Sequence, residues 1–413
     1  MTSPVAIAQR LVAAAPALRA TSDDQLLAAW RNTLAAFLDP TSAERRQLDP
    51  YLLQTTGLST AGLDHGLQSI GSGMLGEPAA AELRRPHRQT EDGFSLVVLP
   101  AEPPGLILQS LLPALAARAP VLFKSSRAEP HFVPAFLTAL GHRLPPLLHA
   151  YAVATWTGGD PEVEAPLHAS ARLVVAYGSE ETVSAVQAAA PGRCVVFGPK
   201  LSLGWVGPGA DPERAARGMA VDIATFDQRG CLSVHAVFAD PAIAGAFATA
   251  LASALNELAT ELPPGRTDPA DRAGVRLARE DADLRGLTWY GKALDDGTVI
   301  LENDVRTSPS PGLRTVRIHP AADVPPLHEW HGRLQGLAVA GDLPPAVHEA
   351  FLKAGVSRFA PAGALQTTDA TWRNDGIDLA TEFAGSTNRE SNLQRGLNRL
   401  QDRYASAFRR LAE

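Results

Sequence analysis

Short apolar runs alternate with segments of helical periodicity through the middle of the chain. The runs predict five strands, at Phe94–Leu99, Val121–Lys124, Tyr151–Trp156, Leu173–Tyr177 and Cys194–Phe197. Between them, apolar residues at helical spacing predict helices over about 106–117, 132–140 and 180–190. Strands and helices in alternation form right-handed βαβ crossovers, so the pattern predicts a largely parallel sheet covered by helices. This is the architecture of nucleotide-binding domains.

A second α/β region is predicted after residue 209. Helices are expected over about 212–226 and 241–258, with strands at 232–238, 297–301, 313–318 and 336–340. Residues 261–271 are rich in Pro, Gly and charge, which is typical of a solvated loop. Residues 1–90 instead favour helices and loops, with Ser22 as an N-cap before an apolar stripe.

The length of 413 residues exceeds the usual size of one domain, so two or three domains are expected. We predict N-terminal helices and a dinucleotide-binding domain over residues 1–203, and a catalytic domain over residues 204–385. Residues 386–413 are polar and place Leu393, Leu397, Leu400 and Tyr404 on one helical face. We predict that this C-terminal helix packs against a domain or a subunit interface.

Composition and charge argue against several classes of protein: nucleic-acid binders, membrane-spanning proteins, disulfide-rich proteins and metalloproteins. The net charge of −7 comes without long runs of one sign, which argues against nucleic-acid or anionic-membrane partners. No stretch of eighteen uncharged apolar residues occurs, so no membrane span is predicted, and Val5–Ala20 favours an amphipathic helix over a signal peptide. Two well-separated cysteines form no disulfide framework, which predicts a cytoplasmic protein. We expect no metal site, because His328 and His331 lack the spacing of zinc ligands.

One of the two cysteines, Cys231, lies in the segment Asp227–Ser233, directly after a glycine and among polar residues. A nucleophilic thiol needs access, stabilisation of its anion and a backbone that can approach a substrate, and these neighbours could supply all three. The alternative is a small core residue at the start of an apolar strand. Taken alone, the segment leaves both interpretations open.

Several segments together resemble the LuxC-type acyl-CoA reductases of the aldehyde dehydrogenase superfamily. They are Val121–Ser126, Trp156–Asp160, Val174–Val183, Phe197–Ser202 and Asp227–Ser233, with Trp372–Gly376 as a looser sixth. Their order and spacing match that family from about residue 50 to residue 385. The resemblance implies an aldehyde dehydrogenase-like α/β fold, with a Rossmann-type cofactor domain and an α/β catalytic domain, a homo-oligomer, and Cys231 as the catalytic nucleophile.

The resemblance also implies cofactor-binding residues. Lys124 and Ser126 fall in the run that holds the adenosine ribose in the superfamily, and Arg127 stands where a glutamate repels an added phosphate. An arginine there favours NADPH over NADH, although a solvated arginine at a helix start is the alternative. Gly178 and Ser179 fall where the family has a turn facing the pyrophosphate, and a helix N-terminus suits such an anion. Without the resemblance, they would be an ordinary helix cap.

Two departures from the superfamily pattern bear on the chemistry. Aldehyde-oxidising members have a glutamate that activates water where this chain has Val196, so hydrolysis of a thioester at Cys231 is expected to be slow. Glu102 lies where the superfamily usually has an asparagine that binds the oxyanion, and losing such a donor typically costs roughly 3 kcal/mol of transition-state stabilisation. The first departure favours reduction of an acyl thioester, and the second raises the alternative of weakened activity.

The sequence therefore favours an NADPH-dependent enzyme that reduces acyl-CoA, or an acyl-carrier-protein thioester, to an aldehyde through an S-acyl Cys231 intermediate. A cysteine-dependent acyl transferase or thioesterase without nicotinamide chemistry is the alternative enzyme. A degenerate, non-catalytic relative is the third interpretation. His235, four residues after Cys231, is expected to be structural, because four residues of strand separate side chains by about 13 Å.

Overall fold

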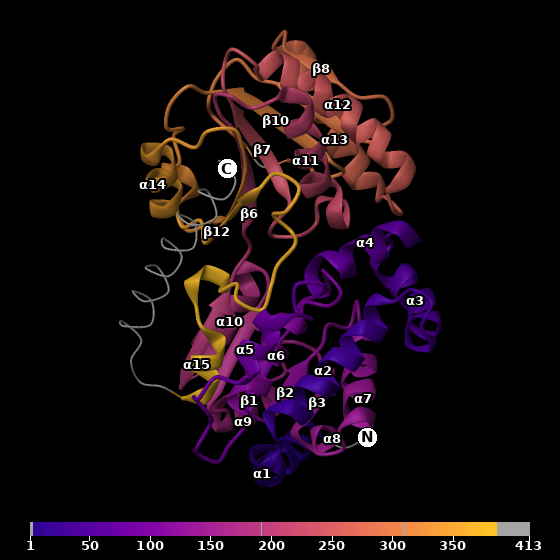
Figure 1. The fold of residues 1–413 in the computed structure, drawn as a ribbon, viewed down its shortest axis with the longest axis vertical. Coiled ribbons are helices and arrows are strands. Elements are labelled where there is room, and N and C mark those ends of the chain that lie inside the picture. Colours follow the sequence, from indigo (N-terminus) through magenta and orange to yellow (C-terminus); the bar gives the residue numbers. More distant parts are fainter. Residues whose placement is uncertain (1–2, 191, 309, 386–413) are drawn as a thin grey trace. The chain divides into compact units, whose positions relative to one another are not determined.

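The computed structural model describes residues 3–190, 192–308 and 310–385, and it forms two compact units (Figure 1). Unit 1 comprises residues 1–56, 67–199 and 368–413, and unit 2 comprises residues 57–66 and 200–367. The predicted domain boundary lay at residues 203 and 204, near the passage of the chain from unit 1 to unit 2. The predicted C-terminal helix over residues 386–413 lies outside the described residues.

Helices dominate the N-terminal residues, as predicted. They are α1 (Pro4–Ala20), α2 (Asp23–Leu38), α3 (Ala43–Thr56), α4 (Thr60–Gly71) and α5 (Glu77–Leu83). Ser22 caps α2 in a capping box, since its hydroxyl accepts the Gln25 amide while the Gln25 side chain accepts the Ser22 amide. In α1 the buried face is formed by Ala8, Leu11, Ala15 and Leu18.

The sheet of unit 1 has five parallel strands, and all five predicted strands are confirmed. They are β1 (Ser95–Val98), β2 (Val121–Lys124), β3 (Tyr151–Ala154), β4 (Leu173–Tyr177) and β5 (Arg193–Phe197). Their order is β3-β2-β1-β4-β5. The connecting segments contain α6 (Leu108–Ala117), α7 (Phe132–Arg143), α8 (Leu147–Ala150), α9 (Pro161–Ser170) and α10 (Glu180–Ala189). The strands are almost wholly apolar, because helices cover both faces of a parallel sheet.

Unit 2 contains a seven-stranded sheet in the order β12-β11-β6-β7-β10-β9-β8, in which only β8 runs antiparallel to its neighbour. Its strands are β6 (Leu201–Val206), β7 (Val234–Ala239), β8 (Thr288–Tyr290), β9 (Thr298–Leu301), β10 (Thr315–Pro320), β11 (Leu334–Ala340) and β12 (Arg358–Pro361). Its helices are the first part of α4, which ends in unit 1, and α11 (Pro212–Ala224), α12 (Ala244–Glu261), α13 (Pro269–Leu284) and α14 (Pro345–Lys353). Strand β7 begins two residues later than predicted, so Cys231 precedes it in a turn.

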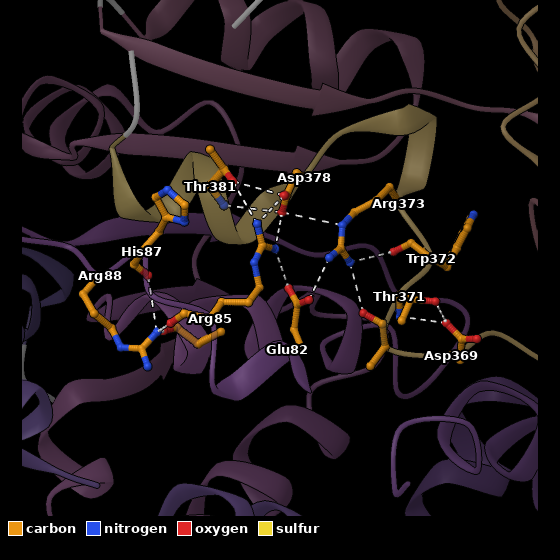
Figure 2. A network of polar contacts seen from close by, with 12 residues as sticks. Glu82, Arg85, His87, Arg88, Asp369, Thr371, Trp372, Arg373, Asp378 and Thr381 are labelled. Atoms are coloured by element: carbon orange, nitrogen blue, oxygen red, sulfur yellow. Dashed lines mark hydrogen bonds and ion pairs between the residues drawn. The ribbon is translucent and has the colours of Figure 1, made fainter. Parts of the chain in front are cut away.

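A network of charged side chains fastens the last described segment of unit 1 to α5. Figure 2 shows Arg85 and Arg373 pointing toward Glu82 and Asp378, so that cations and carboxylates alternate. Arg85 bonds Glu82 at 2.9 Å and Asp378 at 2.5 and 2.7 Å, and Arg373 bonds Glu82 at 2.7 Å. Asp378 is also the N-cap of α15 (Leu379–Ala384), which packs on α6. The network therefore anchors a helix whose sequence position is almost 300 residues from Arg85.

Asp378 has a low pKa because of these partners. Burial alone would raise the pKa of its carboxyl, but hydrogen bonding to Arg85 and the charges of Arg373 and Arg85 lower it to about 2, from an ordinary value of 3.8. Since the folded-state pKa is the lower one, this group stabilises the fold above about pH 4. That contribution is lost as the pH falls from 3.8 toward 2.

We predict that Asp378→Asn lowers the free energy of unfolding of unit 1 by roughly 3 kcal/mol at pH 7, because two partly buried guanidinium groups lose a countercharge. The matched control is Asp92→Asn, which breaks an ion pair to Arg19 in which Asp92 is 74% exposed. That substitution is expected to leave the urea unfolding curve unchanged. Equal effects of the two substitutions would contradict the assigned role of the network.

Candidate active site

The five-stranded sheet of unit 1 has the strand arrangement of a dinucleotide-binding fold. Strands β2 and β3 follow β1 on one side, and β4 and β5 follow on the other, so the strand order reverses between β1 and β4. In open parallel sheets, ligands bind beyond the carboxyl ends of the strands at such a reversal point. By this rule, the topology predicts a ligand site at the carboxyl edge of this sheet.

All five predicted cofactor-binding residues lie along this carboxyl edge. Lys124 ends β2, and Ser126 and Arg127 follow it in the next loop. Gly178 and Ser179 follow β4. Because all strands are parallel, the ends of β2 and β4 are brought to one edge despite some fifty intervening residues. Within unit 1, these residues therefore lie at one edge of the sheet, at the ends of the two strands that flank β1.

Lys124 is half-buried against an aromatic ring. Its ammonium nitrogen lies 5.5 Å from the centre of the Trp156 ring, in a cation–π contact. Burial lowers the pKa of Lys124, with the nearby charge of Arg127 acting in the same direction and Glu164 opposing it. Arg127 donates a hydrogen bond to the Thr157 hydroxyl at 3.3 Å. Lys124 at the end of β2 and Arg127 in the loop after it thus place two cations next to the turn that follows β3.

Gly178 and Ser179 form the start of α10. The Ser179 hydroxyl accepts the Thr182 amide at 3.3 Å and caps the helix. The first-turn amides of α10 have no acceptor within the helix, and together with the helix dipole they favour an anion. Glu180 and Glu181 also occupy this first turn, where they suit the dipole by themselves. The geometry fits both a phosphate-facing turn and a simple cap.

Cys231 lies in unit 2, in a tight turn at the amino ends of β6 and β7. The turn closes with a bond from the Ser233 amide to the Gly230 carbonyl at 3.0 Å, and the Gly230 amide donates to the Ser233 hydroxyl at 3.2 Å. Ser202, at the start of β6, donates its hydroxyl to the Cys231 carbonyl at 2.9 Å. The thiol-bearing residue is half-buried, whereas Ser202 and Ser233 are wholly buried.

The backbone that leads into this turn is left-handed at three consecutive residues. Phe226, Asp227 and Gln228 have φ values of 56°, 51° and 65°. None of the three is glycine, and such conformations cost about 1 to 3 kcal/mol each. A second left-handed stretch, Leu313 and Arg314, follows Gly312 just before β10. Strain of this kind persists only where surrounding contacts over-determine the conformation.

Side chains of the strained residues supply those contacts. Asp227 accepts a guanidinium hydrogen bond from Arg314 at 2.7 Å and the Gly265 amide at 2.9 Å. Gln228 donates to the carbonyls of Val234 and Thr315, both at 2.8 Å. The Phe226 ring packs so closely on α4 that a Cβ at Gly66 would come within 2.3 Å of it. The two left-handed stretches therefore stabilise each other's backbone conformation through the Asp227–Arg314 and Gln228–Thr315 contacts.

Gln366 connects this turn to a buried carboxylate, and sequence reasoning missed both residues. Its amide nitrogen lies 3.1 Å from the Ser233 hydroxyl, 3.0 Å from the Asp222 carbonyl and 3.4 Å from the Thr225 carbonyl. The Asp222 carboxylate accepts the amides of Gly363 at 2.6 Å and Leu365 at 2.9 Å, which fixes the segment that carries Gln366. Asp222 sits in an otherwise ordinary helix pattern, so no signal in the sequence distinguishes it.

Three further residues that the sequence singled out lie on or next to strands of the two sheets. His235 lies on β7, and burial lowers its pKa to about 4, so it is neutral at physiological pH. Val196 lies on β5 and packs against an apolar cluster of unit 1 that includes Leu96 and Val174. Glu102 is half-buried between β1 and α6, and its relation to Cys231 stays a prediction.

Neither a metal-ligand group nor a membrane-spanning helix occurs in the described part of the chain. It holds no group of three or more His, Cys, Asp or Glu side chains arranged for a metal ion. Within the same residues, no helix has both the length and the apolar character that a membrane span requires.

A family model of LuxC acyl-CoA reductases matches residues 64–384. The chain belongs to this family. The match confirms the resemblance drawn from the motifs. The long-chain acyl-protein thioester reductase of Photorhabdus laumondii is 28% identical over 200 residues, which cover 47% of this chain and 42% of that protein. The one of Aliivibrio fischeri is 24% identical over 240 residues, 56% and 50% of the two chains. The chain thus spans half or less of the length of these curated relatives.

Solved structures confirm the aldehyde dehydrogenase-like fold. An NADP-dependent enzyme of E. coli superimposes with a TM-score of 0.68 at 16% identity, over 87% of this chain and 82% of that one. A putative aldehyde dehydrogenase, PutA of Anabaena variabilis, gives 0.65 at 17% identity, over 93% and 92%. At these identities the likeness establishes the fold.

We predict that Asp222 makes the stability of unit 2 pH-dependent. Burial raises the pKa of its carboxyl to about 7, from an ordinary 3.8, although its backbone hydrogen bonds oppose the shift. Because the folded state holds the proton more tightly, the contribution of this group is largest below about pH 4 and is lost as the pH rises toward 7. The stability of the wild type relative to Asp222→Asn is expected to be greater at pH 5 than at pH 8, by on the order of 2 kcal/mol.

Urea unfolding at the two pH values measures this difference. The control is Asp323→Asn, which removes an exposed carboxyl in the same unit and is expected to show no such pH dependence. Identical pH dependence of the wild type and Asp222→Asn would show that Asp222 titrates normally.

Proposed function

We propose that this protein reduces an acyl thioester, carried by CoA or by an acyl-carrier protein, to an aldehyde with NADPH. The observation that carries the proposal is the Cys231 turn, where two strained left-handed stretches and a buried polar network position a single half-buried thiol. Strain held in place by surrounding contacts is typical of functional sites. Membership of the acyl-CoA reductase family supports the same chemistry.

In the proposed reaction, the Cys231 thiolate attacks the thioester carbonyl, forming an S-acyl enzyme while the bond to the carrier thiol breaks. The carrier thiolate leaves and takes up a proton. NADPH, which Lys124, Arg127 and the α10 N-terminus would hold, would supply the hydride that the carbonyl carbon of the S-acyl group accepts. The bond to Cys231 then breaks, which releases the aldehyde and regenerates the thiolate. The balance is thioester, NADPH and a proton to aldehyde, thiol and NADP⁺.

The direction toward aldehyde is supported by the residue at position 196. Aldehyde-oxidising relatives need a carboxylate base there to activate water, and this chain has a valine side chain packed in an apolar cluster. Without a base, hydrolysis of the S-acyl group is slow. The intermediate then persists long enough to accept hydride.

The preference for NADPH is supported by the two cations at the carboxyl edge of the sheet in unit 1. A doubly charged 2′-phosphate suits Arg127, whose guanidinium hydrogen-bonds Thr157, next to Lys124. The α10 N-terminus suits the pyrophosphate.

The two cysteines form no disulfide, which is in keeping with a cytoplasmic enzyme. We propose that the enzyme acts as a homo-oligomer.

We predict that Cys231→Ala abolishes acyl-CoA-dependent oxidation of NADPH, because no S-acyl enzyme can form. The absorbance of NADPH is followed with a series of acyl-CoA chain lengths, and the matched control is Cys194→Ala, on β5 in unit 1. The control is expected to keep at least half of the wild-type rate. An unchanged rate in Cys231→Ala would refute the scheme, and release of CoA without NADPH would indicate a thioesterase.

We predict that Arg127→Glu shifts the cofactor preference away from NADPH. A carboxylate next to the 2′-phosphate site repels NADPH, so kcat/KM for NADPH is expected to fall at least tenfold, which corresponds to about 1.4 kcal/mol. The value for NADH is expected to change less than twofold. The control is Arg10→Glu, which makes the same charge change on an exposed position of α1. Parallel losses with both cofactors would exclude Arg127 as the residue that selects the phosphate.

A further inference from the structure

Glu164, in the first turn of α9, holds the turn that follows β3 with both of its carboxylate oxygens. One oxygen accepts the indole N–H of Trp156 at 3.0 Å, and the other accepts the backbone amide of Gly159 at 3.0 Å. The two donors lie at the start and near the end of the turn Trp156–Asp160. A single side chain therefore sets both the orientation of the Trp156 ring and the path of the backbone behind it.

Two of the residues of this turn, Gly158 and Gly159, carry no side chain, so open space surrounds its backbone. Gly159 has a φ of 81°, which favours glycine, and a Cβ at Gly158 or Gly159 would meet no atom within 4 Å. At the α9 end of the turn, the Asp160 carboxylate caps the helix by accepting the Glu162 amide. Without Glu164, the amide of Gly159 and the indole N–H would lose these partners.

The two cations of the loop after β2 both meet this turn. Lys124 pairs in register with Ala154, two residues before Trp156, and its ammonium lies 5.5 Å from the centre of the Trp156 ring. Arg127 donates to Thr157 at 3.3 Å. The position of each cation thus depends on a residue of the turn, and the turn depends on Glu164.

Glu164 also acts on the charge of Lys124. Burial and Arg127 disfavour the charged ammonium, and the negative charge of Glu164 favours it. Glu164 and Arg127 are the charged groups that act on Lys124 here. Removing the Glu164 charge would leave Lys124 half-buried beside a second cation, and its protonated form would be less stable.

We propose that Glu164 is a positioning residue for the cofactor: it braces the Trp156–Gly159 turn and keeps Lys124 and Arg127 placed for the phosphate-bearing ribose, without contacting the cofactor itself. This inference rests on the proposed use of NADPH. It assigns to the chain a residue of α9 that lies outside every motif used to recognise the family.

The test measures binding of adenosine 2′,5′-bisphosphate to the full chain by titration calorimetry, so no reductase activity is needed. Glu164→Gln keeps the size of the side chain but replaces one acceptor oxygen with a donor, and its Kd is expected to rise about tenfold. The matched control is Glu162→Gln, which removes the same charge from an exposed position two residues earlier on the same helix. Its Kd is expected to stay within twofold of the wild type.

A second readout separates positioning from a general loss of structure. In Glu164→Gln, the alkaline limit of binding is expected to move to lower pH, because Lys124 loses its favourable neighbour, while the melting temperature stays within about 2 °C of the wild type. Trp156→Phe keeps an aromatic face next to Lys124 but removes the indole N–H, and we expect an intermediate Kd with an unshifted alkaline limit.

Wild-type Kd and pH profile in Glu164→Gln would overturn the inference. Equal weakening of binding by Glu162→Gln would overturn it too, since the effect would then be one of helix charge. Failure of the wild type to bind the probe while it still reduces acyl-CoA with NADH would overturn the NADPH proposal and this inference, but leave the role of Cys231 intact.

Discussion

Asp227 and Arg314 form the ion pair on which the geometry around Cys231 depends. Each lies in a left-handed stretch of non-glycine residues, and the pair joins the two stretches at 2.7 Å. Arg314 is almost wholly buried, so its charge requires this partner, and a second guanidinium nitrogen donates to the Leu262 carbonyl at 2.9 Å. Ion pairs of this kind add little net stability compared with apolar packing, but they specify one arrangement. Here the specified arrangement is the entry into a turn that presents a thiol.

Opposite edges of two sheets carry the two halves of the proposed chemistry. In unit 1, the residues assigned to the cofactor lie at or just beyond the carboxyl ends of β2 and β4, where parallel strands collect loops from distant parts of the sequence. In unit 2, Cys231 precedes β7 and contacts Ser202 at the amino end of β6. The first edge exposes amides and cations suited to an anion. At the second edge, the polar groups of Ser202 and Ser233 are buried and Cys231 is half-buried. The two edges therefore differ in electrostatic character.

The sequence contained enough to predict the five strands of unit 1 and the residues that follow β2 and β4, whereas β6, β8 and β12 of unit 2 were not predicted. All five strands of unit 1 were apparent as apolar runs, because burial on both faces makes them nearly continuous. Helix α9 was not apparent: it contains two prolines, and only Leu167 and His168 of its residues are buried. Gln366, Asp222 and Glu164 could not be found either, because their partners are backbone amides, carbonyls and an indole, which leave no spacing rule in the sequence. Left-handed backbone at Phe226 and Gln228 was likewise unpredictable, since it arises from tertiary contacts that override local preference.

Gln366 stands two residues before Thr368, where the chain leaves unit 2 for unit 1. Connections between compact units usually accept insertions and deletions, because loop closure depends only weakly on length. This connection is different, since Gly363 and Leu365 are hydrogen-bonded to Asp222, and Gln366 is hydrogen-bonded to Ser233 in the Cys231 turn. The number of residues from 363 to 366 is therefore fixed by these hydrogen bonds. Natural length variation among homologues should fall outside this tetrapeptide, which marks it as a poor site for splicing in a linker or for recombining the units into chimaeras.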